Sequence, residues 1–83
     1  MTIHTALRQA CRLFEGAGVS PPRLTAEVLL GHVLGCERAY LYAHSDESLS
    51  QRAEERYLAS VRQRLEGKPT QYITGAQEFY GRP

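Results

Sequence analysis

Apolar residues in this chain recur at the spacing of an α-helix, and glycines or prolines punctuate the helical segments. Between Thr2 and Ala17 the apolar positions follow steps of three and four residues: Ile3, Leu7, Ala10, Cys11, Phe14 and Ala17. This spacing places them on one face of an amphipathic helix. Gly16 and Gly18 predict where that helix ends, and the segment Val19–Pro22 predicts a turn.

The second predicted helix begins near Pro21 or Pro22, with Ser20 as its cap, and ends at Gly35. Its apolar residues cover most of the helix circumference: Leu24, Ala26, Val28, Leu29, Leu30, Val33 and Leu34. A helix that is apolar on several sides is typical of the centre of a bundle.

Two more helices are predicted, over Glu37–His44 and Gln51–Glu66. The first of these has a continuous apolar run without a clear helical period. The second can be capped by Ser50, and Leu49 is expected to return to the core. Its predicted buried stripe consists of Ala53, Tyr57, Leu58, Val61 and Leu65.

The segment after Gly67 and Pro69 has a different character. Thr70–Ile73 could form one helical turn that Gly75 stops, whereas Gln77–Tyr80 is predicted to be extended. A chain of 83 residues has room for one core. The sequence therefore predicts an all-α fold, a small bundle of four to five short helices with an extended C-terminal tail.

The residues that could act in catalysis or bind a metal are scattered along the sequence and form no cluster. His32 and Cys36 are four residues apart, but Gly35 is predicted to end the helix between them, and no second pair of metal ligands is nearby. The histidines fall in separate segments, without a motif that would pair one with a nucleophile. Gly16 and Gly18 follow a helix instead of linking a strand to a helix, as a phosphate loop would. We therefore expect no catalytic, cofactor-binding or metal-binding residue.

Charge patterning argues against nucleic acid and membranes as direct partners. The net charge is +1, and acidic residues are interleaved with the arginines of the predicted helix at 51–66. A helix-turn-helix reading of residues 22–44 would leave Arg38 as the one basic residue of its recognition helix. The start has no signal-peptide pattern, and two scattered cysteines suit a reducing compartment, so a cytoplasmic location is expected.

Glu27 is the unusual residue, because it lies within the most apolar predicted helix. A buried carboxylate needs a charged or hydrogen-bonding partner. Arg23, one helical turn earlier, could provide it, as could a basic residue from another helix. An internal ion pair is the favoured interpretation, with an exposed, solubilising glutamate as the alternative.

Three segments, in the same order, resemble the amino-terminal domain of HemK/PrmC release-factor glutamine methyltransferases. Residues 23–35 (RLTAEVLLGHVLG) are similar to the family's second-helix signature, although Thr25 stands where aspartate is frequent. Residues 64–75 (RLEGKPTQYITG) resemble the Gly-x-Pro and Tyr-Ile-x-Gly elements that close the domain. Residues 77–81 (QEFYG) resemble the Glu-Phe-Tyr-Gly that begins the link to the catalytic domain.

The resemblance implies that residues 1–75 form a substrate-docking domain and that residues 76–83 begin a connector to a methyltransferase domain. That domain would bind S-adenosylmethionine and methylate the glutamine of the Gly-Gly-Gln motif in class-I peptide-chain release factors. The family's Asn-Pro-Pro-Tyr motif does not occur in this chain. The fragment is therefore expected to be inactive alone, and to bind the release factor and the catalytic domain.

Eight family-signature residues are expected to be structural: Glu27, Leu29, Leu30, Arg64, Pro69, Tyr72, Gly75 and Phe79. The alternative to a docking domain of a larger enzyme is a stand-alone helical protein-interaction module.

Overall fold

Helices account for the secondary structure of residues 1–75, the part of the chain described by a computed structural model. In order they are α1 (Ile3–Gly16), α2 (Pro22–Leu34), α3 (Arg38–Ala43), α4 (Gln51–Leu65) and α5 (Thr70–Thr74). The predicted all-α bundle is thus confirmed, with five helices in this part. The predicted extended segment, the connector at 76–83 and Phe79 lie outside the described residues.

Helix α1 forms as its periodicity predicts. Thr2 caps its N-terminus by accepting a hydrogen bond from the backbone N–H of Thr5 at 3.2 Å. The buried face carries Ile3, Ala6, Leu7, Ala10 and Phe14. Ala17 was expected on that face but is exposed, because the helix ends at Gly16 and Gly18 turns the chain away with a positive φ of 76°.

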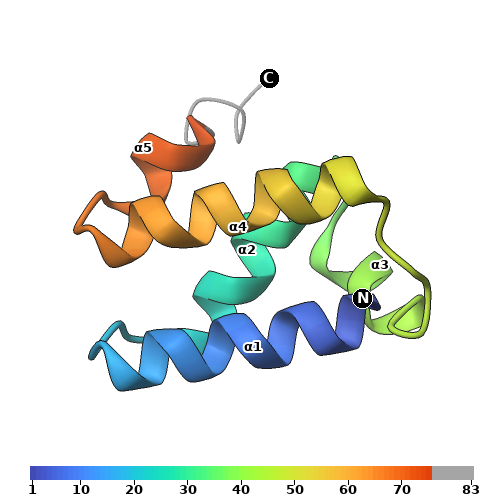
Figure 1. The fold of residues 1–83 in the computed structure, drawn as a ribbon, viewed down its shortest axis with the longest axis horizontal. Helices are drawn as coiled ribbons and strands as arrows, with labels where there is room; N and C mark the ends of the chain where they lie inside the picture. The colour runs from blue at the N-terminus through green and yellow to red at the C-terminus, as the bar shows by residue number, and fades with distance from the viewer. Residues whose placement is uncertain (76–83) are drawn as a thin grey trace.

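Helix α2 is the central element, as predicted, and packs against the four other helices (Figure 1). Two details of the prediction are wrong. Ser20 does not cap it: Pro21 is the N-cap residue, and its carbonyl accepts a hydrogen bond from the Thr25 hydroxyl at 2.7 Å. Leu24 is 40% exposed, whereas Thr25 and Ala26 beside it are buried. Gly35 ends the helix in the left-handed conformation, as expected.

Helix α2 lies between α1 and α4, and α5 lies on the side of α4 that faces away from α1 (Figure 1). Ser50 caps α4 by accepting from the backbone N–H of Ala53 at 3.1 Å, which confirms that prediction. Its core contacts come from Tyr57 and Val61, with Ala53 partly buried. The prediction that Leu58 and Leu65 are buried is wrong, because the two side chains are 48% and 36% exposed.

The segment between α3 and α4 returns to the start of the chain. Leu49 is buried in the core, as predicted, and its backbone N–H donates to the carbonyl of Met1 at 2.8 Å. The backbone N–H of Ile3 donates to the carbonyl of Glu47 at 3.0 Å. In α3 only Leu41 is buried, which explains the absence of a helical period in its apolar run. These contacts close the end of the bundle where α1 begins.

Candidate functional site

The carboxylate of Glu27 is buried and gathers three donors from two helices. Arg23, one turn earlier on α2, donates from Nε to Oε2 at 2.8 Å. Arg38, on α3, donates from Nε to Oε1 at 3.0 Å. The hydroxyl of Tyr42, also on α3, donates to Oε2. The expected internal ion pair is thus confirmed, and α3 supplies two partners that local spacing could not indicate.

Electrostatics keep Glu27 ionised. Burial by itself would raise the pKa of Glu27, but the hydrogen bonds from Tyr42, Arg23 and Arg38 together hold that pKa below its ordinary value of 4.5. The side chains of Arg23 and Arg38 are 45% and 52% exposed, so their outer nitrogens remain in contact with water. The cluster therefore ties α3 to α2, and it offers no proton-transfer pair for acid–base chemistry.

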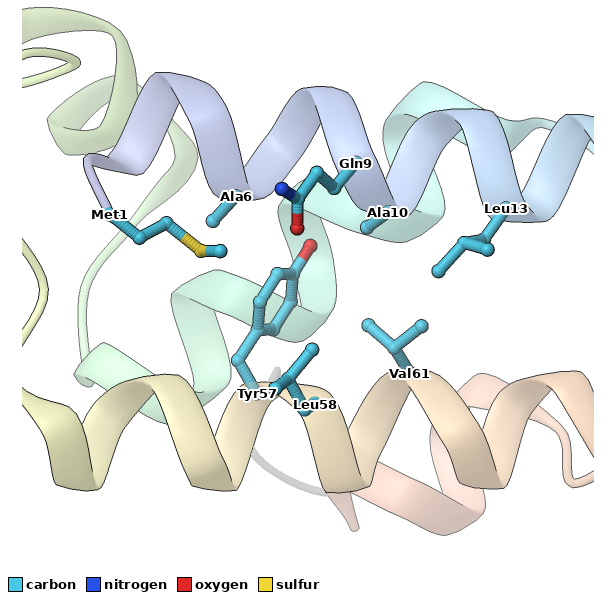
Figure 2. A pocket seen from close by; sticks show the side chains of 8 residues that line it. All are labelled: Met1, Ala6, Gln9, Ala10, Leu13, Tyr57, Leu58 and Val61. Carbon is cyan, nitrogen blue, oxygen red and sulfur yellow. The ribbon is translucent and has the colours of Figure 1, made fainter.

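A second feature is a narrow slot between α1 and α4, shown in Figure 2. The residues that line this α1–α4 slot are Met1, Ala6, Gln9, Ala10, Leu13, Tyr57, Leu58 and Val61. Tyr57 and Val61 point from α4 toward α1 (Figure 2). Its enclosed volume is about 20 Å³, which holds little more than one water molecule. The slot is too small for a cofactor, whose pockets measure roughly 300–1,000 Å³.

The floor of the slot is fixed by a buried hydrogen bond. The hydroxyl of Tyr57 donates to the backbone carbonyl of Ala26 on α2 at 2.9 Å. Burial raises the pKa of Tyr57 well above its ordinary value, so the phenol stays neutral and remains a donor. Tyr57 therefore links α4 to α2. The exposed residues Met1, Leu13 and Leu58 form the rim of the slot.

A shallow hollow lies beside the slot on the outer side of α1. It is lined by Thr5, Arg8, Gln9 and Arg12, and its volume is about 140 Å³. Gln9 lines both the hollow and the slot, so the two features adjoin. Both arginines are exposed. The lining is basic and polar, and it contains no histidine or carboxylate that could activate the Thr5 hydroxyl as a nucleophile.

The cysteines and histidines form no reactive group. Cys11 and Cys36 are free thiols, and burial is the main cause that raises the pKa of each. A raised pKa leaves little thiolate at neutral pH, which makes both poor nucleophiles. No cluster of three or more potential metal-binding side chains occurs within residues 1–75.

The signature residues occupy three separate places. Glu27, Leu29 and Leu30 are buried together in α2. Arg64 is in the last turn of α4, and its buried Nε has no hydrogen-bond partner within residues 1–75. Pro69 and Gly75 bracket α5 as its N-cap and C-cap, whereas Tyr72 between them is 71% exposed. These positions surround no common pocket, and a structural role for them remains a prediction.

Sequence reasoning missed the slot. It grouped Leu58 and Leu65 with the core because their spacing from Val61 fits a helical face, yet the two leucines are seven residues apart on the open edge of that face. The sequence did contain a signal for exposed apolar residues, because the apolar positions of α4 span a wider arc than one neighbouring helix can cover. Which of these positions are buried depends on how α1, α2 and α5 are placed against α4.

The structure thus defines a class: a small all-α domain whose distinctive features are a buried ionic tie and an open apolar slot. The sequence adds the family. Residues 5–75 match the family model described as the PrmC N-terminal domain. The chain therefore belongs to the PrmC N-terminal domain family.

Curated relatives have a consistent name. The chain is 44% identical over 82 residues to a release factor glutamine methyltransferase of Koribacter versatilis, covering 99% of the chain and 29% of that protein. It is 43% identical over 75 residues to the protein of the same name in Chlorobaculum tepidum, covering 90% of the chain and 26% of that protein. It is 43% identical over 79 residues to the protein of that name in Moorella thermoacetica, covering 95% of the chain and 28% of that protein.

The chain spans less than a third of the length of these relatives. The comparison with solved structures found no match. Within residues 1–75, every helix is too short or too polar to cross a membrane.

Proposed function

We propose that residues 1–75 are the docking domain of a release factor glutamine methyltransferase, and that residues 76–83 begin its connector to the catalytic domain. The observation that carries this proposal is the family match over residues 5–75, together with relatives of that name at 43–44% identity. The chain would bind the release factor and orient it, while methyl transfer would take place in the catalytic domain.

The chemistry of the described residues supports a binding role over a catalytic one. The slot and the hollow are too small to hold S-adenosylmethionine, the methyl donor we propose for the whole enzyme. Neither feature contains a general base or nucleophile beside a cavity. No residue within 1–75 is therefore assigned to the cofactor.

A docking domain is useful for physical reasons. The substrate would be one glutamine of a Gly-Gly-Gln motif on a large protein, and a pocket that reads a single amide side chain gains little specificity. A second contact site raises the effective concentration of the target and limits its orientations. The near-neutral charge of the chain fits a protein partner better than nucleic acid. Because release factors act in translation, we place the enzyme in the cytoplasm.

The test compares the full-length enzyme with a form lacking residues 1–75. Methylation would be measured on the intact release factor and on a short peptide that contains the Gly-Gly-Gln loop. Docking predicts that the deletion lowers kcat/KM for the intact factor by about tenfold or more, and leaves kcat/KM for the peptide nearly unchanged. Equal efficiency of the two enzymes on the intact factor would refute the docking role.

A further inference from the structure

Three of the exposed large apolar side chains within residues 1–75 line the α1–α4 slot. Met1, Leu13 and Leu58 line it and are 40%, 49% and 48% exposed. Leu65, which is 36% exposed, follows Leu58 by two helical turns on the same side of α4. Leu13 from α1 and Leu58 from α4 therefore give the slot an exposed apolar rim. Such surfaces in soluble domains mark sites where another protein binds.

The charges around the slot are unevenly paired. On α1, Arg8 and Arg12 are exposed and lie next to the slot through their shared neighbour Gln9. Neither takes part in the ion pairs found within residues 1–75. On α4, by contrast, the carboxylate of Glu54 is held by the amino group of Met1 at 3.2 Å. The rim therefore offers positive charge that is available to a partner.

The rest of the described chain leaves the slot open. Helix α5 packs against α2 and α4 on the side of α4 away from α1 (Figure 1). A second copy of the chain is also a poor occupant. A two-fold dimer through this surface would bring Arg8 and Arg12 of both copies into one interface, which concentrates like charge there. Positive charge beside an apolar slot suits a partner with the opposite charge.

We infer that the α1–α4 slot is the surface on which the release factor docks; this inference rests on the proposed function. An apolar side chain of the release factor packs on the outer rim of the slot, against Leu13 and Leu58. Acidic side chains that flank this anchor on the release factor pair with Arg8 and Arg12. The apolar anchor supplies most of the affinity, and the arginines contribute to the association rate and to the choice of partner.

The experiment uses the full-length enzyme with two double variants. Leu13→Gln with Leu58→Gln removes the apolar rim, and glutamine keeps good helix propensity. Arg8→Glu with Arg12→Glu reverses the rim charge without changing a buried residue. Each double variant is expected to lower kcat/KM for the intact release factor by about tenfold or more, without loss on the Gly-Gly-Gln peptide. The charge-reversal effect should shrink as salt is raised.

Matched controls come from exposed positions away from the slot. Leu24→Gln changes a leucine of α2 that is 40% exposed, and Arg52→Glu reverses an exposed arginine of α4 that lines neither the slot nor the hollow. Both should leave kcat/KM for the intact factor within about twofold of the parent enzyme. Circular dichroism would check that every variant is folded, and the charge-reversal pair tests the slot even if the leucine pair unfolds.

The outcomes separate this inference from the proposed function. If deleting residues 1–75 impairs methylation of the intact factor but both slot variants behave like the controls, docking stands and this surface is wrong. If the deletion has no effect, both are wrong. Equal loss on factor and peptide would mean that the catalytic domain covers the slot. Conversion of a dimer to a monomer by the leucine variant would mean that a second copy does. Either result overturns the inference.

Discussion

The backbone carbonyl of Cys36 lies 2.8 Å from the point where a side-chain Cβ on residue 31 would be placed. Gly31 is buried in α2, and its own carbonyl accepts a hydrogen bond from the backbone N–H of Cys36 at 3.0 Å. The turn after α2 therefore folds back so closely that only glycine fits at position 31. The link between α2 and α3 depends on this approach.

Gly31→Ala is accordingly expected to destabilise the domain by about 1–3 kcal/mol, because the Cβ must displace backbone. The loss should occur although alanine is the better helix former. Gly16→Ala is the matched control: nothing lies within 4 Å of its Cβ position, and the change should be neutral or stabilising by up to about 1 kcal/mol. Urea unfolding of both variants measures the difference, and equal stabilities would contradict the close approach of the Cys36 carbonyl to Gly31.

Glu27→Gln tests the ionic tie. The neutral amide keeps the volume but presents an N–H group to one of three donors, leaving at least one of Arg23, Arg38 and Tyr42 without an acceptor. We expect a loss of about 2–4 kcal/mol in the free energy of unfolding. Glu55→Gln, at an exposed position of α4, should change it by less than about 0.5 kcal/mol. A Glu27→Gln variant as stable as the parent would show that the carboxylate is not required.

The Glu27 cluster also shows what sequence can and cannot predict. Arg23 was predictable as a partner because four residues along a helix bring two side chains together. Arg38 and Tyr42 were not, because their approach depends on how α3 is placed against α2. The helices themselves were predictable from local spacing, as were the glycine stops. Whether Leu58 is covered, by contrast, depends on the separation of α1 and α4.

Acid stability should depend on Glu27. Because its pKa is lower in the folded protein than the ordinary 4.5, the stabilisation is fully present above about pH 4.5 and is lost as pH falls through the folded pKa. The parent should therefore lose more stability between pH 5 and about pH 3 than Glu27→Gln does. Chemical unfolding across that range gives the comparison. Parallel pH profiles for the two proteins would mean that another carboxylate dominates acid unfolding.

Alkaline pH should expose the role of Tyr57. Its pKa is raised by burial, so the stabilisation is complete below the ordinary value of 10.0 and is lost as pH rises above it. In an ultraviolet titration, one tyrosine should ionise only as the chain unfolds. Tyr57→Phe should remove that late step and cost about 0.5–1.5 kcal/mol at neutral pH, through loss of the hydrogen bond to Ala26. A late step that persists in Tyr57→Phe would assign it to a different tyrosine.

Two serines that precede helices make a matched pair for the last prediction. Ser50 accepts a hydrogen bond from the backbone N–H of Ala53, whereas Ser20 precedes Pro21, which occupies the N-cap position of α2 without a side-chain bond. Ser50→Ala should cost about 1 kcal/mol, because a first-turn N–H of α4 loses its acceptor. Ser20→Ala should be neutral within about 0.5 kcal/mol, since it removes no capping bond. Equal losses in thermal or urea unfolding would mean that Ser20 stabilises the start of α2 after all, and that the proline alone does not set the beginning of that helix.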